Sequence, residues 1–140
     1  MEFNLERFVI AQEQDYLIAL EEIKSGLKIK HWMWYIFPQL YGLGKSGTSK
    51  LYAISGLEEA KEYLNHPVLG SRLKEITNEL LLLEELDAEQ IFGFPDCLKL
   101  QSSMTLFNLV DESEVGIFKK VLEKYYNGQF DNNTIELLDK

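Results

Sequence analysis

The stretch His31–Gly44, HWMWYIFPQLYGLG, contains both tryptophans of the chain and three further aromatic rings. Rings of this size dominate the burial of a small domain, so such a stretch fills the core or holds a ligand. Helical spacing over residues 32–37 places Trp32 on one face and turns Trp34 away from it. Pro38 ends the helical turn, because proline disfavours helical geometry in the preceding residue. We therefore expect different rings of the stretch to serve the two purposes.

Apolar residues recur at helical spacing along most of the chain, and no segment alternates as a strand does. A long first helix is expected to begin at an Asn4 cap and to end at Gly26. Ser55 and Glu58 match a capping box, and Asp131 can cap the last helix. The other predicted helices cover 57–64, 67–86, 87–93, 96–110, 113–126 and 131–138, with single turns at 32–37 and 50–54. The expected fold is all-α: a compact, single-domain orthogonal bundle of six to eight helices without a significant sheet.

Length and composition limit the class of protein. The 140 residues are 46% hydrophobic, which suffices for one domain, residues 1–140, with a single core. No apolar run approaches the roughly twenty residues that cross a bilayer, and the first residues lack the pattern of a secretory signal. The single cysteine, Cys97, cannot form an internal disulfide, which suits the cytoplasm. A net charge of -9 argues against a nucleic acid partner. We expect a cytoplasmic protein with no membrane partner.

The charge is unevenly distributed along the sequence. Between Glu22 and Glu58 there are five lysines and no acidic residue. Such a window would focus a small anion toward the aromatic stretch. The alternative is a chance cluster of solvated lysines.

The glycine loop GLGKSGTSK, residues 42–50, partly matches a phosphate-binding P-loop. The first glycine of that motif is replaced by Gln39, and no strand leads into the loop. These departures argue against a nucleoside-triphosphate site. Backbone amides of the loop, together with Lys45 or Lys50, remain candidates for holding an anion.

A second polar group lies within the predicted helix 96–110. Lys99, Ser102 and Ser103 are three and four residues apart, so one helical face can carry a cation with two hydroxyls. Buried polar groups need partners, and the alternative is a structural contact with another segment. His31 is the candidate general acid or base, with a structural role as its alternative. Two histidines and one cysteine without paired spacing predict no metal site, and no cofactor is expected.

Several segments resemble a known family. They are FNLERFVIAQ at the start, HWMWYIFPQL, NHPVLGSRL at Asn65–Leu73 and KLQSSMTLF at Lys99–Phe107. In this order they resemble the small bacterial family catalogued as domain of unknown function 1810, over nearly the whole chain. The resemblance implies a compact, mainly helical fold, and no reaction, ligand or site residue. Members often carry the label calpastatin, which does not fit here, because an inhibitor of that kind is a long disordered chain.

The first functional hypothesis is a domain that binds a polar or anionic small molecule, with a nucleotide as one candidate. Its cleft would be formed by HWMWYIFPQL, the glycine loop and the KLQSS segment, with His31 as a tentative catalytic residue. We expect Trp34, Gln39, Lys99 and Ser102 to converge on one cavity. The candidate ligand-binding residues are Trp32, Trp34, Gln39, Lys45, Lys50, Tyr52, Lys99, Ser102 and Ser103.

The second hypothesis is a protein–protein interaction module without catalysis. The exposed part of the aromatic stretch would be its hot spot, for a protein partner or for a second copy of the chain. This hypothesis predicts an open apolar patch, whereas the first predicts a concave cleft lined by polar groups. The sequence leaves open whether the protein is an enzyme.

Overall fold

The computed structural model describes residues 3–139, and these residues form nine α-helices and no strand. The helices are α1 (Glu6–Ser25), α2 (Met33–Ile36), α3 (Gly47–Leu51), α4 (Leu57–Asn65), α5 (Leu69–Leu82), α6 (Ala88–Phe92), α7 (Asp96–Val110), α8 (Ile117–Tyr126) and α9 (Asn132–Leu138). The all-α prediction is confirmed. The number exceeds the expected six to eight because the turns α2 and α3 count as helices.

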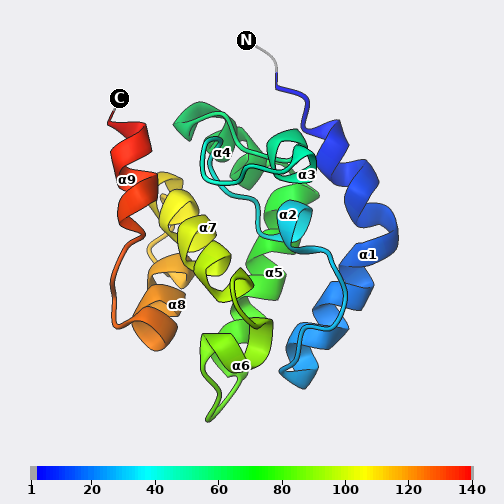
Figure 1. Ribbon diagram of the computed structural model, residues 1–140, viewed down its shortest axis with the longest axis vertical. Coiled ribbons are helices and arrows are strands. Elements are labelled where there is room, and N and C mark those ends of the chain that lie inside the picture. The colour runs from blue at the N-terminus through cyan, green and yellow to red at the C-terminus, as the bar shows by residue number, and fades with distance from the viewer. Residues whose placement is uncertain (1–2, 140) are drawn as a thin grey trace.

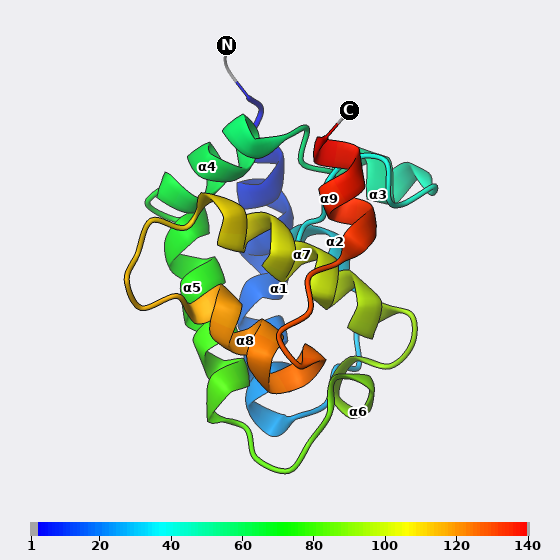
Figure 2. The same cartoon turned by 90° about the vertical axis from the view of Figure 1, so that its left-hand side faces the viewer.

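Two helices, α5 and α7, hold the others together (Figure 1). Helix α5 contacts α1, α4 and α8, whereas α7 contacts α4, α6, α8 and α9. In Figure 1, α1 runs along one side of the molecule and α9 lies on the opposite side. Figure 2 shows α9 beside α7. On its other side, Leu137 of α9 lies against Gly42, in the loop between α2 and α3. The last helix therefore lies next to segments from the first half of the chain.

One side of the aromatic stretch is buried in the hydrophobic core. Trp32, Met33, Ile36 and Phe37 have exposed fractions of only 1–2%. The rings of Trp32 and Phe37 meet Phe92 of α6 edge-on, with ring centroids 6.4 and 5.9 Å apart. These buried positions follow helical spacing, because residues four apart on a turn share a face. The predicted division of the stretch into a buried side and an accessible side is thus present.

A network of polar contacts around Gln12 joins the stretch to α1, α4 and α5. Gln12 of α1 is 2% exposed, and its amide donates to the backbone carbonyl of Tyr35 at 2.7 Å and to the Tyr63 hydroxyl at 3.0 Å. Arg72 of α5 donates to the Gln12 side-chain oxygen at 3.3 Å. Buried polar groups are tolerated when they are paired in this way.

Two predicted helix caps are wrong, although α4 begins at Leu57 as predicted. Helix α1 begins at Glu6 without a side-chain cap, and Asn4 instead accepts a hydrogen bond from Arg7 through its carbonyl. The capping box of Ser55 with Glu58 does not form. Glu59 occupies that role, because its carboxylate accepts from the Ser55 N–H at 2.7 Å and pairs with Arg7 at 3.0 Å.

Other helix boundaries differ by a few residues. Helix α3 begins earlier than predicted because Ser46 caps it, accepting from the Ser49 N–H at 3.1 Å. Helix α5 is shorter than the predicted 67–86, and α8 begins at Ile117 instead of Ser113. The ends at Gly26 and Gly93 and the caps at Asp87 and Asp131 are confirmed.

Candidate functional site

A hollow of about 220 Å³ lies between the loop after α2, the start of α7 and the start of α9; we call it the Lys99 hollow. Three of the sequence-predicted residues, Gln39, Lys99 and Ser102, line it. Asp131 and Asn133 add further polar groups from the α9 end. The remaining lining residues are Leu43, Gly44, Pro95 and Leu98. The hollow is therefore concave and partly apolar, with polar side chains from three separate parts of the chain.

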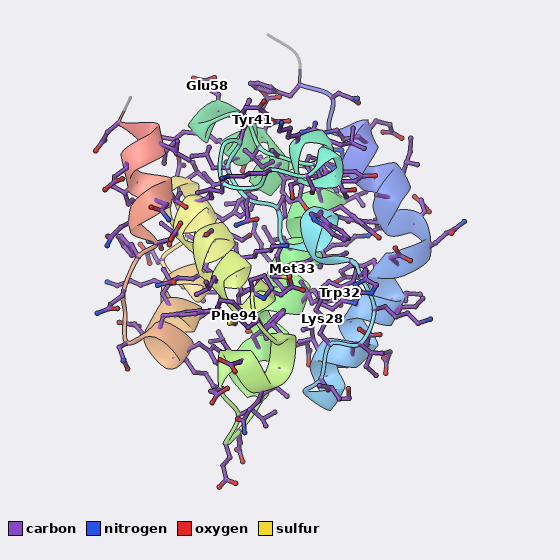
Figure 3. The ribbon with its side chains drawn as sticks, in the orientation of Figure 1. Lys28, Trp32, Met33, Tyr41, Glu58 and Phe94 are labelled. Atoms are coloured by element: carbon purple, nitrogen blue, oxygen red, sulfur yellow. The ribbon has the colours of Figure 1, made fainter. Side chains whose placement is uncertain are left out.

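Lys99 belongs to a row of three charged side chains, Lys28, Asp96 and Lys99, that connects the two tryptophan rings. Its Nζ lies 3.4 Å from Asp96 Oδ1 and 5.6 Å from the centre of the Trp34 ring. The other Asp96 oxygen is 2.9 Å from Nζ of Lys28, which lies 5.2 Å from the centre of the Trp32 ring. Figure 3 shows Lys28 beside Trp32. Of the four residues expected to converge on one cavity, Trp34 is the one that does not line the hollow; its ring lies against Lys99 instead.

The buried Trp32 is held by a carboxylate on the preceding helix. Its indole N–H donates to Glu22 Oε1 at 2.8 Å, and the backbone N–H groups of Ile29 and Lys30 donate to the same oxygen. Burial by itself would raise the pKa of the Glu22 carboxyl, but these hydrogen bonds and nearby Lys28 hold the pKa below its ordinary value. Glu22 thus stays ionised and fixes the chain between α1 and α2.

Ser102 and Asp131 join α7 to the start of α9. The Ser102 hydroxyl is 2.9 Å from Asp131 Oδ2 and 3.2 Å from the Leu98 carbonyl oxygen. A hydroxyl has one proton to donate, so its lone pairs remain able to accept from a ligand. The structural alternative considered for Ser102, a contact with another segment, is realised, and the same side chain also lines the hollow.

The glycine loop contributes backbone and an apolar side chain to the hollow. Gly44 lines it beside Leu43. A Cβ at Gly44 would lie 2.4 Å from Cβ of Ser49, so any larger residue would push the loop away from α3. Glycine at position 44 therefore allows the loop to pack closely on α3.

Lys45, Lys50 and His31 do not line the Lys99 hollow, and all three are exposed. The glycine loop therefore brings its backbone to the hollow without its two lysines. His31 precedes the buried Trp32, yet its own side chain faces solvent. The geometry gives these three residues no role at this site.

Trp32, Tyr52 and Ser103 are held in the interior or its margin. Trp32 is 1% exposed, and Tyr52 packs on Phe8 and Tyr35 with ring centroids 6.0 and 5.1 Å apart. Ser103 is 0% exposed, and within residues 3–139 its hydroxyl has no hydrogen-bond partner. None of the three lines the hollow, so they are not part of the site proposed below.

Asp131 and Asn133 are lining residues that sequence reasoning did not assign to a site. The sequence identified Asp131 as a helix cap, which it is, because its side chain accepts from the Thr134 N–H at 3.1 Å. No local sequence pattern predicts that Asp131 also contacts Ser102, which lies on a different helix.

Cys97 behaves as an ordinary buried thiol, since burial and nearby Glu89 raise its pKa.

Two other surface hollows contain none of the predicted site residues. One of about 250 Å³ lies between α5 and residues 111–118, and one of about 350 Å³ lies between the Leu40–Tyr41 segment and the end of α9.

Among residues 3–139, no three histidine, cysteine or acidic side chains come together as a metal site would require. No helix in the same range has the length and hydropathy to cross a membrane.

Comparison with known proteins places the chain in a family. The family model described as "Protein of unknown function (DUF1810)" matches residues 2–138. A crystal structure of the conserved hypothetical protein Rv1873 from Mycobacterium tuberculosis is similar over 99% of this chain and 98% of that one, with 47% identity and a TM-score of 0.95. No match is found among the curated proteins. The chain therefore belongs to the DUF1810 family.

Proposed function

We propose that this protein binds a small polar molecule in the Lys99 hollow. The observation that supports the proposal is that Gln39, Lys99 and Ser102, which are remote along the chain, line one concavity. The side-chain amides of Gln39 and Asn133 make no hydrogen bond with residues 3–139, so both can bind a ligand. A few convergent polar groups on an apolar wall are typical of small-molecule sites.

The volume of the hollow limits the size of the ligand. About 220 Å³ is below the range of roughly 300–1,000 Å³ that is common for drug-sized ligands. A single ring with one or two substituents fits this space better than a complete nucleotide. A neighbouring hollow that shares Leu43 and Asn133 gives room for a substituent to extend along α9.

The charges favour a polar ligand without net negative charge. The lining contains one cation, Lys99, and one carboxylate, Asp131. The Lys99 ammonium is already near Asp96, and Lys45 and Lys50 lie outside the hollow. A phosphate would gain one lysine but would also approach Asp131, and like charges in a confined site repel.

Tryptophan fluorescence provides the test. A ligand that reaches Lys99 should change the emission of Trp34, because the ammonium lies against its ring. We expect neutral polar metabolites from a defined panel to change the emission of the wild type and to have a weaker effect on Gln39→Ala and Lys99→Met. Lys50→Met is the matched control, because Lys50 is exposed outside the hollow. A panel without any response, or equal loss in all three variants, would contradict the proposal.

The second candidate, the interaction module, has exposed aromatic rings in its favour, but not the single open patch that it predicts. Tyr41 and Phe94 are 56% and 72% exposed. Figure 3 shows them in different halves of the molecule, so they do not form one patch. Phe94→Ser, measured by sedimentation at several concentrations, tests this candidate. Loss of self-association in the variant, with the fluorescence response intact, would favour an interaction module over the binding domain.

A further inference from the structure

Asp131 is held more firmly than its role as a helix cap requires. Its backbone N–H donates to Thr105 Oγ1 at 2.9 Å, and its Oδ2 accepts from the Thr134 N–H at 3.1 Å. The Thr134 hydroxyl, at 2.6 Å, and the Ser102 hydroxyl, at 2.9 Å, donate to the same oxygen. A capping side chain needs only the bond to the backbone N–H. The three hydroxyl groups belong to side chains no more than 5% exposed, so the carboxylate is held on a rigid support.

The second oxygen of this carboxylate, Oδ1, is free to accept a hydrogen bond from a molecule bound in the hollow. Within residues 3–139 it accepts no hydrogen bond, and Asp131 forms no ion pair with Lys99 or with any other cation there. Asp131 lines the hollow, so this oxygen is the acceptor that a bound molecule would meet. An ionised carboxylate only accepts hydrogen bonds and therefore needs a donor opposite it.

Resting on the binding function proposed above, we propose that Asp131 determines the ligand class by accepting a hydrogen bond from an N–H group. The ligand is then a neutral amide or an amino-substituted ring, and carboxylates of similar shape are rejected. Lys99, which only donates, binds the carbonyl oxygen or ring nitrogen of the same molecule. Gln39 and Asn133 have amides that both donate and accept, so they add affinity without choosing between an amide and an acid.

Pairs of probes that differ in one group provide the test. Benzamide and benzoate share a ring and differ in an amide against a carboxylate, and nicotinamide and methyl nicotinate share a ring and differ in an amide against an ester without a hydrogen-bond donor. Binding is followed through the side-chain amide signals of Gln39 and Asn133 in nitrogen–proton NMR spectra. We expect the wild type to bind the donor-bearing member of each pair at least about tenfold more tightly, because a site that hydrogen-bonds an N–H group discriminates against an analogue that lacks it.

Asp131→Asn is the decisive variant. Asparagine caps helices about as well as aspartate, so the fold should survive, which a melting curve verifies. The asparagine amide can also donate, so the preference between the paired probes should fall to about twofold or less. An unchanged preference in the variant, with binding still lost in Lys99→Met, would overturn the role of Asp131 and leave the binding function standing. Absence of Gln39 and Asn133 signal changes with all four probes would overturn both proposals.

Discussion

Trp32 and Trp34 are two residues apart, yet one is a core residue and the other borders the Lys99 hollow. Each indole ring lies close to a lysine ammonium, Lys28 in the first case and Lys99 in the second. The difference is burial: Trp32 is 1% exposed and its N–H is paired with Glu22, whereas Trp34 is only half-buried. The same chemical pair therefore stabilises the fold at one position and leaves a ring accessible at the other.

Asp96 connects these two regions. It is shared by Lys28, whose side chain is 6% exposed, and Lys99, whose side chain is 26% exposed. Asp96 lies in the first turn of α7, so its negative charge also interacts favourably with the N-terminal end of that helix. One carboxylate thus neutralises a buried cation and positions the cation of the hollow.

The largest expected effect is on the core side of the comparison. Trp32→Ala should lower the free energy of unfolding by about 3–5 kcal/mol, because it removes a fully buried ring and leaves a cavity. Chemical denaturation of the purified variant measures this change. A loss below about 1 kcal/mol would mean that the core does not depend on Trp32.

Removing the shared carboxylate should have an intermediate effect. Asp96→Asn removes the ion-pair partner of the buried Lys28, and we expect a loss of about 1–3 kcal/mol, less than for a fully buried pair because Asp96 is 20% exposed. Glu112→Gln is the control, because its pair with Lys61 is exposed and should contribute less than about 1 kcal/mol. Equal losses in the two variants would contradict the special position of Asp96.

A smaller stability effect is expected on the hollow side. Trp34→Ala should change the free energy of unfolding by about 1 kcal/mol or less, because the ring is half-buried and its contact with Lys99 is worth about 0.5–1 kcal/mol. The same variant should weaken the binding of any molecule that contacts Lys99. Denaturation and the NMR titration described above measure both. A loss as large as that of Trp32→Ala would remove the distinction between the two rings.

The smallest effect concerns pH. Because the pKa of Glu22 is lowered in the folded protein, its ionised form stabilises the fold above the ordinary value of 4.5, and this contribution disappears as the pH falls through the lowered pKa. The stability difference between wild type and Glu22→Gln should therefore be present at neutral pH and shrink below about pH 4.5. Glu21→Gln, at an exposed neighbouring position, is the matched control. A constant difference for Glu22→Gln across this range would contradict the assignment.

The local chemistry of the sequence was sufficient to predict most helices. The ends at Gly26 and Gly93 and the caps at Asp87 and Asp131 follow from residues in immediate sequence contact. The cap expected at Asn4 does not form: the Asn4 carbonyl accepts from Arg7, and Arg7 in turn is held by the remote Glu59. Local signals predict a helix end well where no remote side chain competes for it.

The site was only partly predictable. Gln39, Lys99 and Ser102 could be selected as polar interruptions of apolar segments, and the structure brings them to one hollow. Whether the side chains of Lys45, Lys50 and Tyr52 reach the hollow depends on the direction in which the glycine loop leaves the aromatic stretch. That direction is a property of packing, and no spacing in the sequence encodes it.

By itself the sequence determined an all-helical chain in which Trp32 and Trp34 face different ways, because helical periodicity is a local property of the backbone. Only the tertiary structure decided that α9 packs beside α7 and brings Asp131 to Ser102. Hydrogen bonds between remote helices form only after burial has chosen which helices are neighbours. The chemistry of the Lys99 hollow therefore depends on packing over the whole molecule.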